Sequence, residues 1–243
     1  MIVIPRVTKP LVVQQSPIPR QNLALWLRAD RGVVLDTTST PTVSQWLDQS
    51  GNGRHATQET KASQPTLISS SANSKPAVRF VTGFLTCPLV NISDKLEVFV
   101  VFKRIGSSTG NNPGLLSFGD PGIADYTSSS YIAVFYEPGN SVFTWCRAGN
   151  LAGTDSYLTG VDVLAHSAFD GNQNTLTYNS TVYPSVATSG NFNYSVATIG
   201  SRLEPGVFNV YNGEMCELLV YHKTLMATDR GRINNYLKTR YNV

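Results

Sequence analysis

Short apolar stretches, separated by glycine, proline, serine and asparagine, follow one another through most of this chain. Near its start, Leu23, Leu25 and Leu27 occupy every second position, a period that is typical of a β-strand. Similar stretches bounded by turn-forming residues recur further along the sequence. The pattern predicts strands at residues 23–28, 43–47, 77–81, 115–118, 131–136, 141–146, 161–169, 174–178 and 214–221.

One stretch predicts a strand in the middle of a sheet. Residues 96–102 read LEVFVVF and are apolar on both faces after Glu97, as expected of a strand that is covered on each side. Turn sequences at residues 137–140 (EPGN) and 170–173 (DGNQ) each separate two predicted strands and indicate hairpins. We find no repeat of fixed period and no linker within residues 22–243, so we expect one domain there.

A single helix is predicted near the C-terminal end. Ile233, Tyr236, Leu237 and Tyr241 fall on one face of a helix and form an apolar stripe. Thr228 is placed to cap the first turn, and basic residues in the last turn suit the helix dipole. The pattern predicts a helix that covers an edge of the sandwich.

Residues 1–21, MIVIPRVTKPLVVQQSPIPRQ, differ from the rest of the chain. Four prolines exclude a helix and favour extended backbone. Such an apolar arm is expected to dock on a protein surface. A neighbouring molecule is favoured over the arm's own domain, because proline cannot donate to a central strand ladder. The residues expected to bind this partner are Ile2, Ile4, Pro5, Val7, Pro10, Leu11, Val13 and Ile18.

Composition and charge exclude two classes of partner. Only 14% of the residues are charged, and the net charge of +3 arises in residues 1–21, since the remaining basic and acidic residues cancel. No dense basic face is indicated, so nucleic acid is not expected as a partner. No apolar run approaches the roughly 18 residues that a membrane-spanning helix needs.

The three cysteines, Cys87, Cys146 and Cys216, are far apart and lie in apolar surroundings. Their odd number and spacing favour buried free thiols over a disulfide with one thiol left over. No cluster of cysteine and histidine predicts zinc, and no cofactor is expected. The N-terminus lacks the pattern of a signal peptide, so we expect synthesis and folding in a cytoplasm.

The most informative segment is residues 46–58, WLDQSGNGRHATQ. Gly51 and Gly53 can adopt positive φ, and Asp48, Ser50 and Asn52 can bond to nearby backbone, so a tight turn is predicted. Calcium would need several oxygens that converge, and a plain turn explains these residues better.

This segment and the KPAVRF stretch at residues 75–80 resemble a signature of the LamG-like, concanavalin A-like jelly-roll domains. Similar stretches follow in the family's order at residues 197–202 (ATIGSR), 211–222 (YNGEMCELLVYH) and 236–241 (YLKTRY). The resemblance covers about residues 22–243. It implies an all-β fold, a jelly-roll sandwich of two stacked antiparallel sheets with one sheet concave, preceded by the extended arm and followed by one helix.

Sequence motifs argue against an enzyme. Some glycanases of this architecture carry carboxylates at ExDxxE spacing on one strand, which aims them at the same bond. No such motif occurs here, and Glu214 and Glu217, three apart, are expected on opposite faces of a strand. Glu97 has no partner carboxylate nearby, and His166 fits a satisfied residue of a sheet face better than a base. We expect no catalytic residues.

Carbohydrate binding is what the resemblance implies as an alternative. Sugar sites combine an aromatic platform with amide and carboxylate neighbours. The candidates here are Trp145, Tyr131 and Tyr157, with Asp155 close in sequence. Ordinary packing within the sheets is the competing interpretation of these aromatic residues.

The favoured interpretation is a structural component of a bacteriophage virion, made in the host cytoplasm. A sandwich with an apolar arm fits a capsid decoration protein or a fibre subunit, with the arm adding as a strand to a neighbouring virion protein. A homo-oligomer and a host-surface glycan are further expected partners.

Overall fold

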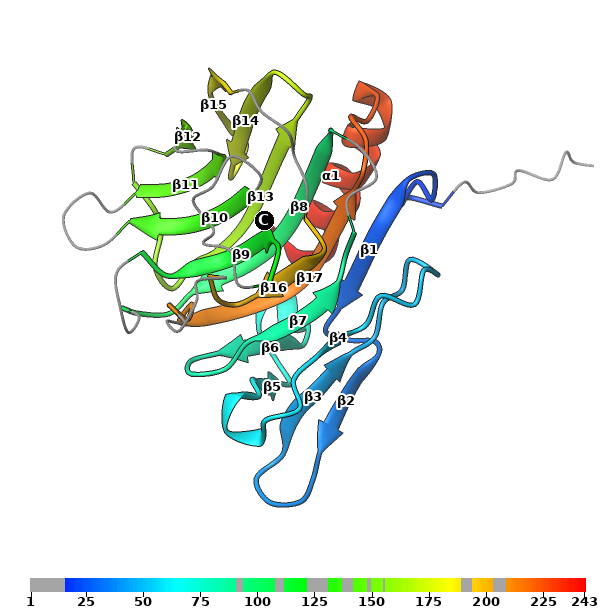
Figure 1. The fold of residues 1–243 in the computed structure, drawn as a ribbon, viewed down its shortest axis with the longest axis vertical. Helices are drawn as coiled ribbons and strands as arrows, with labels where there is room; N and C mark the ends of the chain where they lie inside the picture. Colours follow the sequence, from blue (N-terminus) through cyan, green and yellow to red (C-terminus); the bar gives the residue numbers. More distant parts are fainter. Residues whose placement is uncertain are drawn as a thin grey trace, which may run out of the picture.

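The computed structural model describes residues 16–90, 94–107, 112–121, 131–136, 142–147, 150–154, 156–188, 194–202 and 209–243. Regular structure in these ranges is almost entirely β, in two antiparallel sheets of eight and nine strands (Figure 1). The predicted all-β sandwich with one C-terminal helix is confirmed.

The eight-stranded sheet contains the predicted central strand. Its strands, in order, are β15 (Thr181–Ala187), β14 (Gln173–Tyr178), β13 (Asp162–Phe169), β8 (Leu96–Arg104), β17 (Gly213–Tyr221), β6 (Ala77–Phe80) and β5 (Thr66–Ile68), and β1 (Leu23–Arg28) also pairs with β17. The strand β8 lies between β13 and β17, as the apolar run on both of its faces predicted.

The nine-stranded sheet joins segments from the whole chain. Its strands, in order, are β12 (Asn150–Gly153), β11 (Val142–Arg147), β10 (Tyr131–Tyr136), β9 (Gly114–Gly119), β16 (Val196–Ile199), β7 (Leu85–Pro88), β4 (Ala56–Thr57), β3 (Thr42–Trp46) and β2 (Val33–Asp36). In Figure 1, β2 and β3 lie at the bottom and β12 at the opposite end of the sheet.

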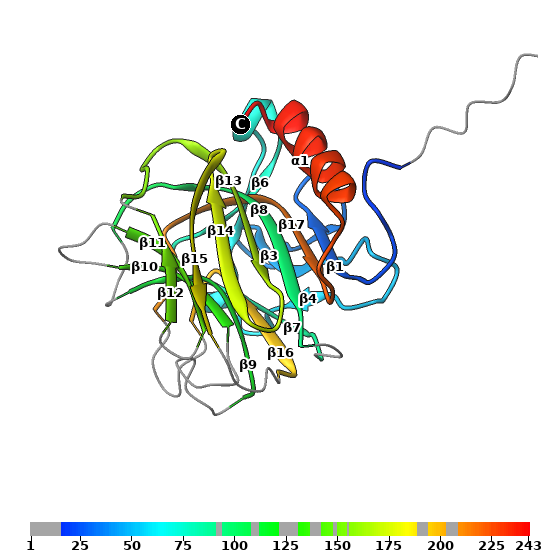
Figure 2. The same ribbon diagram turned by 90° about the horizontal axis from the view of Figure 1, so that it is seen from above.

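Two apolar clusters share the strand β8. Val98, Val100 and Phe102 point between the sheets into the central core, while Phe99 and Val101 point to the other side. There they meet the helix α1 (Ala227–Tyr241), which lies on the side of the eight-stranded sheet away from β9 and β16 (Figure 2). Short 3-10 helices, η1 (Lys61–Ser63) and η2 (Ala72–Ser74), connect strands.

The helix confirms the predicted stripe but not the predicted cap. Ile233, Leu237 and Tyr241 are buried against the sheet. Thr228 lies inside the helix, because the helix begins at Ala227, and Met226, two residues before Thr228, occupies the capping position without a side-chain hydrogen bond.

The end of the arm packs on its own domain. Ile18 is only 1% exposed and joins the cluster beneath α1, and the Tyr221 hydroxyl donates to the Pro19 carbonyl at 3.0 Å. Arg232 on α1 donates to the Ser16 carbonyl. The expected docking of Ile18 on a neighbour is therefore corrected. The other expected arm residues, Ile2, Ile4, Pro5, Val7, Pro10, Leu11 and Val13, lie outside the described residues.

Candidate functional site

The loop at residues 46–58 forms the predicted turn around Asp48. Its carboxylate accepts hydrogen bonds from the backbone of Trp26, Ser50 and Arg54 and from the Ser50 hydroxyl, at 2.7–3.1 Å. Both Asp48 oxygens are thereby occupied. Within the described ranges, no group of three histidine, cysteine or acidic residues is placed to hold a metal ion.

The expected aromatic platform is not on the surface. Trp145 and Tyr131 are fully buried in the central core, with ring centroids 5.3 Å apart. Tyr157 is half-buried, and the Arg104 guanidinium stacks on it at 4.6 Å. Trp145 and Tyr131 cannot offer a ring face to a ligand in this arrangement, so the expectation is corrected in favour of packing. Asp155 lies outside the described residues.

The cysteines that the structure describes are free thiols. Cys87 and Cys216 are buried without a disulfide, as expected, and burial raises the pKa of each to about 12. These thiols therefore stay protonated and act as small apolar residues.

Two carboxylates that the sequence placed on opposite faces lie on the same face. A β-bulge at Cys216 places Met215 opposite Phe102 and Glu217 opposite Val101, so β17 has one extra residue at this point. The extra residue reverses the alternation of side chains along β17, and Glu217 points to the same face as Glu214. Glu214 then bonds to Ser71 and Arg79, whereas Glu217 accepts from Trp26 Nε1 at 2.6 Å and Tyr241 Oη at 2.7 Å. Both carboxylates are buried and engaged, so they hold α1 and η2 on the sheet.

A third buried carboxylate, Glu97, anchors the beginning of α1. It accepts from Arg230 Nε at 2.6 Å, from the Leu225 backbone at 2.8 Å, and meets His166 Nε2 at 2.7 Å. Burial opposes its ionisation, but the hydrogen bonds from His166 and Arg230 outweigh it, and the pKa of Glu97 lies below its ordinary value. The expectation that His166 is a satisfied sheet residue agrees with this contact and with its stacking on Phe99 at 4.1 Å.

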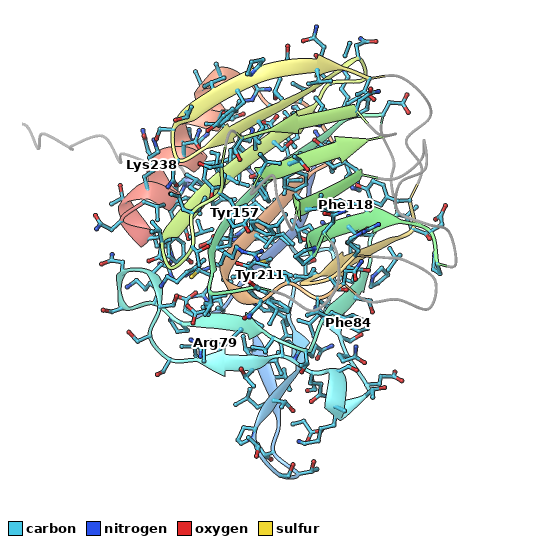
Figure 3. All side chains as sticks on the ribbon, turned by 90° about the vertical axis from the view of Figure 1, so that its left-hand side faces the viewer. Arg79, Phe84, Phe118, Tyr157, Tyr211 and Lys238 are labelled. Carbon is cyan, nitrogen blue, oxygen red and sulfur yellow. The ribbon has the colours of Figure 1, made fainter. Side chains whose placement is uncertain are left out.

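A groove of about 650 Å³ runs beside this anchor, between α1 and the outer face of β13 and β14. Thr175, Thr177 and Ala168 lie along the sheet, and Asn234 and Lys238 line the groove from the helix. Figure 3 labels Lys238 on α1. Lys238 donates to Ser180 at 2.8 Å. His166 and Arg230, which bind Glu97, line the groove. Its lining residues include no pair of free carboxylates.

The outer face of the nine-stranded sheet carries a different arrangement, which we call the polar row. In direct cross-strand register, β3, β4, β7, β16 and β9 place one polar residue each beside the next. Their inward neighbours belong to the central core, and side chains alternate along a strand, so these residues point away from the other sheet. The polar row consists of Gln45, Thr57, Thr86, Thr198 and Ser117.

Two hydroxyls of the polar row lack a partner. Ser117 and Thr198 are fully buried, and neither Oγ atom makes a hydrogen bond to any residue that the structure describes. Thr144, on the nearby strand β11, has an Oγ1 in the same condition. A buried hydroxyl without a hydrogen bond costs about 1–3 kcal/mol, but these hydroxyls are also closed to a ligand. Gln45, Thr57 and Thr86 are half-buried and form the accessible end of the polar row.

At its other end the polar row enters a groove of about 510 Å³ near the edge of the sheet. The Gln45 amide makes no hydrogen bond within the described residues. The Thr42 hydroxyl donates to Gln64 Oε1 at 2.6 Å. The residues that line the groove are Asp36, Ser44, Gln45, Thr57, Gln58, Glu59 and Gln64. Hydrogen bonds from Thr38 and Lys61 lower the pKa of Asp36 to about 2, so this carboxylate stays ionised.

Sequence reasoning missed the polar row because its members come from five strands between residues 45 and 198. A lone threonine or glutamine on a strand gives no local signal. Only cross-strand register brings the five side chains together.

No protein-family model and no curated protein sequence matches this chain. No helix in the described ranges is long and apolar enough to cross a membrane.

Solved structures do match. The chain is similar to a sialidase of Trypanosoma rangeli, with 12% identity and a TM-score of 0.58 over 92% of this chain and 34% of that one. An arabinofuranosidase complexed with arabinofuranosyl-alpha-1,2-xylobiose matches with 13% identity and a TM-score of 0.60, over 83% of this chain and 51% of that one. This chain therefore spans about a third of the sialidase and half of the arabinofuranosidase.

A third match is a domain of nearly the same extent. Domain 4 of an extracellular arabinanase from Geobacillus stearothermophilus, in complex with arabinotriose, is 12% identical with a TM-score of 0.58. The match covers 88% of this chain and 97% of that domain. At these identities the likeness establishes the fold.

These findings correct the functional prediction. Solved structures that share the fold include a sialidase, an arabinofuranosidase and an arabinanase domain, so the interpretation as a bacteriophage virion component is wrong. The described end of the arm, which packs beneath α1, removes part of the structural argument for that interpretation as well.

Proposed function

We propose that this chain is a carbohydrate-binding β-sandwich that holds a neutral oligosaccharide at the accessible end of the polar row, in the groove next to it, without cleaving it. The observation that carries the proposal is the alignment in register of three half-buried polar side chains, Gln45, Thr57 and Thr86, of which the first two line the groove. Strands lie about 4.8 Å apart, so these three neighbours span about 10 Å, a length that suits two linked sugars.

The chemistry of the polar row matches sugar hydroxyls. Threonine and serine hydroxyls and the Gln45 amide both donate and accept, and the row itself carries no charge. Among the described residues no aromatic side chain is exposed. Hydrogen bonds rather than ring stacking would therefore provide most of the affinity.

Binding without hydrolysis fits the carboxylates of the groove. Glycoside cleavage uses two carboxyl groups, and the general acid needs a raised pKa. The groove is lined by Asp36 and Glu59, but Asp36 is ion-paired with Lys61 at 2.9 Å and its pKa is lowered to about 2. Asp36 therefore has no proton to donate near neutral pH.

The comparison with domain 4 of the arabinanase supports the choice of ligand. That domain matches over almost its whole length and its structure holds arabinotriose. A panel of arabinotriose, arabinofuranosyl-xylobiose and a sialylated trisaccharide therefore forms the first set of probes.

The test measures affinity by calorimetry for the wild-type chain and for Gln45→Ala and Thr57→Val. Each variant removes one hydrogen-bonding group and is expected to weaken binding about fivefold, the equivalent of about 1 kcal/mol. The control is Thr177→Val in the groove beside α1, which should bind as the wild type does. Unchanged affinity in both row variants, or loss in the control, would contradict the proposal.

A further arm of the same test uses Thr198→Val. This change removes a fully buried hydroxyl without a partner in the described residues, so it should stabilise the protein and leave sugar binding unchanged. A loss of stability would show that the hydroxyl is satisfied in the free protein. Release of reducing sugar from any probe would contradict the absence of catalysis.

A further inference from the structure

A small pocket lies where the 46–58 loop meets the start of β1 and the end of β17. It has a volume of about 170 Å³, below the usual range for sites that hold a whole small-molecule ligand. The residues that line it are Arg20, Asn22, Leu23, Ala24, Asn52, Arg54 and His222. Two arginines and a histidine thus share a space that fits a single functional group.

Neither guanidinium is neutralised within the part of the chain that the structure describes. Arg54 donates to the Ala24 carbonyl at 3.0 Å, and Arg20 donates to the Gln49 carbonyl at 2.8 Å. Each guanidinium carries five N–H donors, so most remain for another acceptor. The acid of the same loop, Asp48, has both carboxylate oxygens occupied by other donors.

His222 adds a buried polar atom without a partner. The residue is 4% exposed, and its Nε2 meets the Tyr194 hydroxyl at 2.6 Å. Its Nδ1 makes no hydrogen bond with the part of the chain that the structure describes. Since Tyr194 does not line the pocket and His222 does, Nδ1 is the ring nitrogen left for a ligand.

The turn fixes the pocket in place. Asn52 donates to the carbonyls of Leu23 and Ala24 at 2.8 and 3.1 Å, which ties the loop to the start of β1. The His222 backbone donates to the Asn22 carbonyl at 3.1 Å, which ties in the end of β17. The cationic groups are therefore held on three segments that hydrogen bonds connect.

We infer that this pocket binds one oxyanion, held by Arg54 and Arg20 and by the Nδ1 of His222. Guanidinium groups suit planar carboxylate and tetrahedral sulfate or phosphate oxygens, with charge-assisted hydrogen bonds. The inference stands apart from the proposed sugar site, because it shares no residue with the polar row or with the groove next to it.

The anion has two possible sources, a free inorganic ion and the carboxylate of an acidic sugar. Calorimetry with sodium sulfate and with sodium glucuronate distinguishes them, with sodium chloride keeping the ionic strength constant. Binding of sulfate alone indicates an inorganic ion, and stronger binding of glucuronate indicates an acidic sugar. If neither probe binds at millimolar concentration, the inference is overturned.

The variant Arg54→Gln keeps a donor for the Ala24 carbonyl and removes the charge. It is expected to weaken binding of the probe at least about tenfold, as loss of a charged hydrogen bond implies. The matched control is Arg31→Gln, an exposed arginine outside the pocket, which should bind as the wild type does. If both variants lost the same affinity for the probe, the loss would follow from the lower net charge of the protein, and the inference would be overturned.

A second readout does not depend on the variant's folding. Burial, and then the nearby Arg54, lower the pKa of His222 to about 4. The charged and titratable groups around it are Arg54, Arg20 and Tyr194. A bound anion favours the imidazolium, so sulfate should raise the pKa of His222 measured by NMR and bind more tightly as pH falls. The other two histidines, His55 and His166, are internal controls, and a His222 titration that sulfate leaves unchanged would overturn the inference.

Discussion

The neighbours of Trp145 in the fold decide the role of its ring. An aromatic ring on a strand fits a sugar platform as well as a core position, and here Trp145 lies between the sheets, where it meets Tyr131 and Phe143. Its backbone carbonyl accepts from Asn174 at 2.8 Å, but its Nε1 has no hydrogen-bond partner in the described ranges. The ring therefore contributes apolar packing.

We expect Trp145→Ala to lower the free energy of unfolding by about 3–5 kcal/mol, because it leaves a large cavity in the core. Trp145→Phe should cost much less, since it keeps most of the packing and removes an unsatisfied N–H. Urea unfolding measures both. A small effect of the alanine variant would mean that the ring is not buried.

At the scale of elements, buried carboxylates on the outer face of the eight-stranded sheet hold α1. Glu97 accepts hydrogen bonds from Arg230 and the Leu225 backbone at the beginning of the helix, and Glu217 accepts one from Tyr241 at its other end. The helix has no side-chain cap at Met226, so these tertiary bonds fix its position.

Glu97→Gln is expected to lower the free energy of unfolding by about 3 kcal/mol at pH 7, since it breaks a buried ion pair. Because the pKa of Glu97 is lowered in the folded state, its contribution is present above the ordinary value of 4.5 and is lost as pH falls through the folded pKa. The difference between wild type and variant should therefore shrink in acid. A difference that stays constant below pH 4.5 would contradict this role.

At the scale of the whole molecule, the two apolar clusters are coupled through shared strands. β8 and β17 each send alternate side chains into the central core and into the cluster beneath α1. Neither cluster can lose its packing without disturbing strands that the other needs.

We expect one cooperative unfolding transition over the described ranges. Trp26 lies in the cluster beneath α1, whereas Trp46 lies in the central core, so tryptophan fluorescence follows both. Its transition should coincide with that of far-UV circular dichroism during urea unfolding. Two separate midpoints would show that the helix and its cluster unfold independently.

By itself, the sequence determined the features that depend on neighbouring residues. The period of two located β1, and a short stretch bounded by turn-forming residues located β3. The run at residues 96–102 indicated a central strand, and the Asp48 turn followed from residue types that bond to their own backbone. The apolar stripe of α1 was also readable, because a helix face is set by local spacing.

Only the tertiary structure decided what depends on register and on pairing between distant segments. The bulge at Cys216 turned Glu217 to the same face as Glu214, and a single extra residue in a strand is not visible in its periodicity. The polar row unites five strands, and the pocket at His222 unites residues 20–54 with the end of β17. Side-chain alternation is local, but the alignment of strands is set by the packing of the whole core, and the candidate sites therefore appear only in the folded protein.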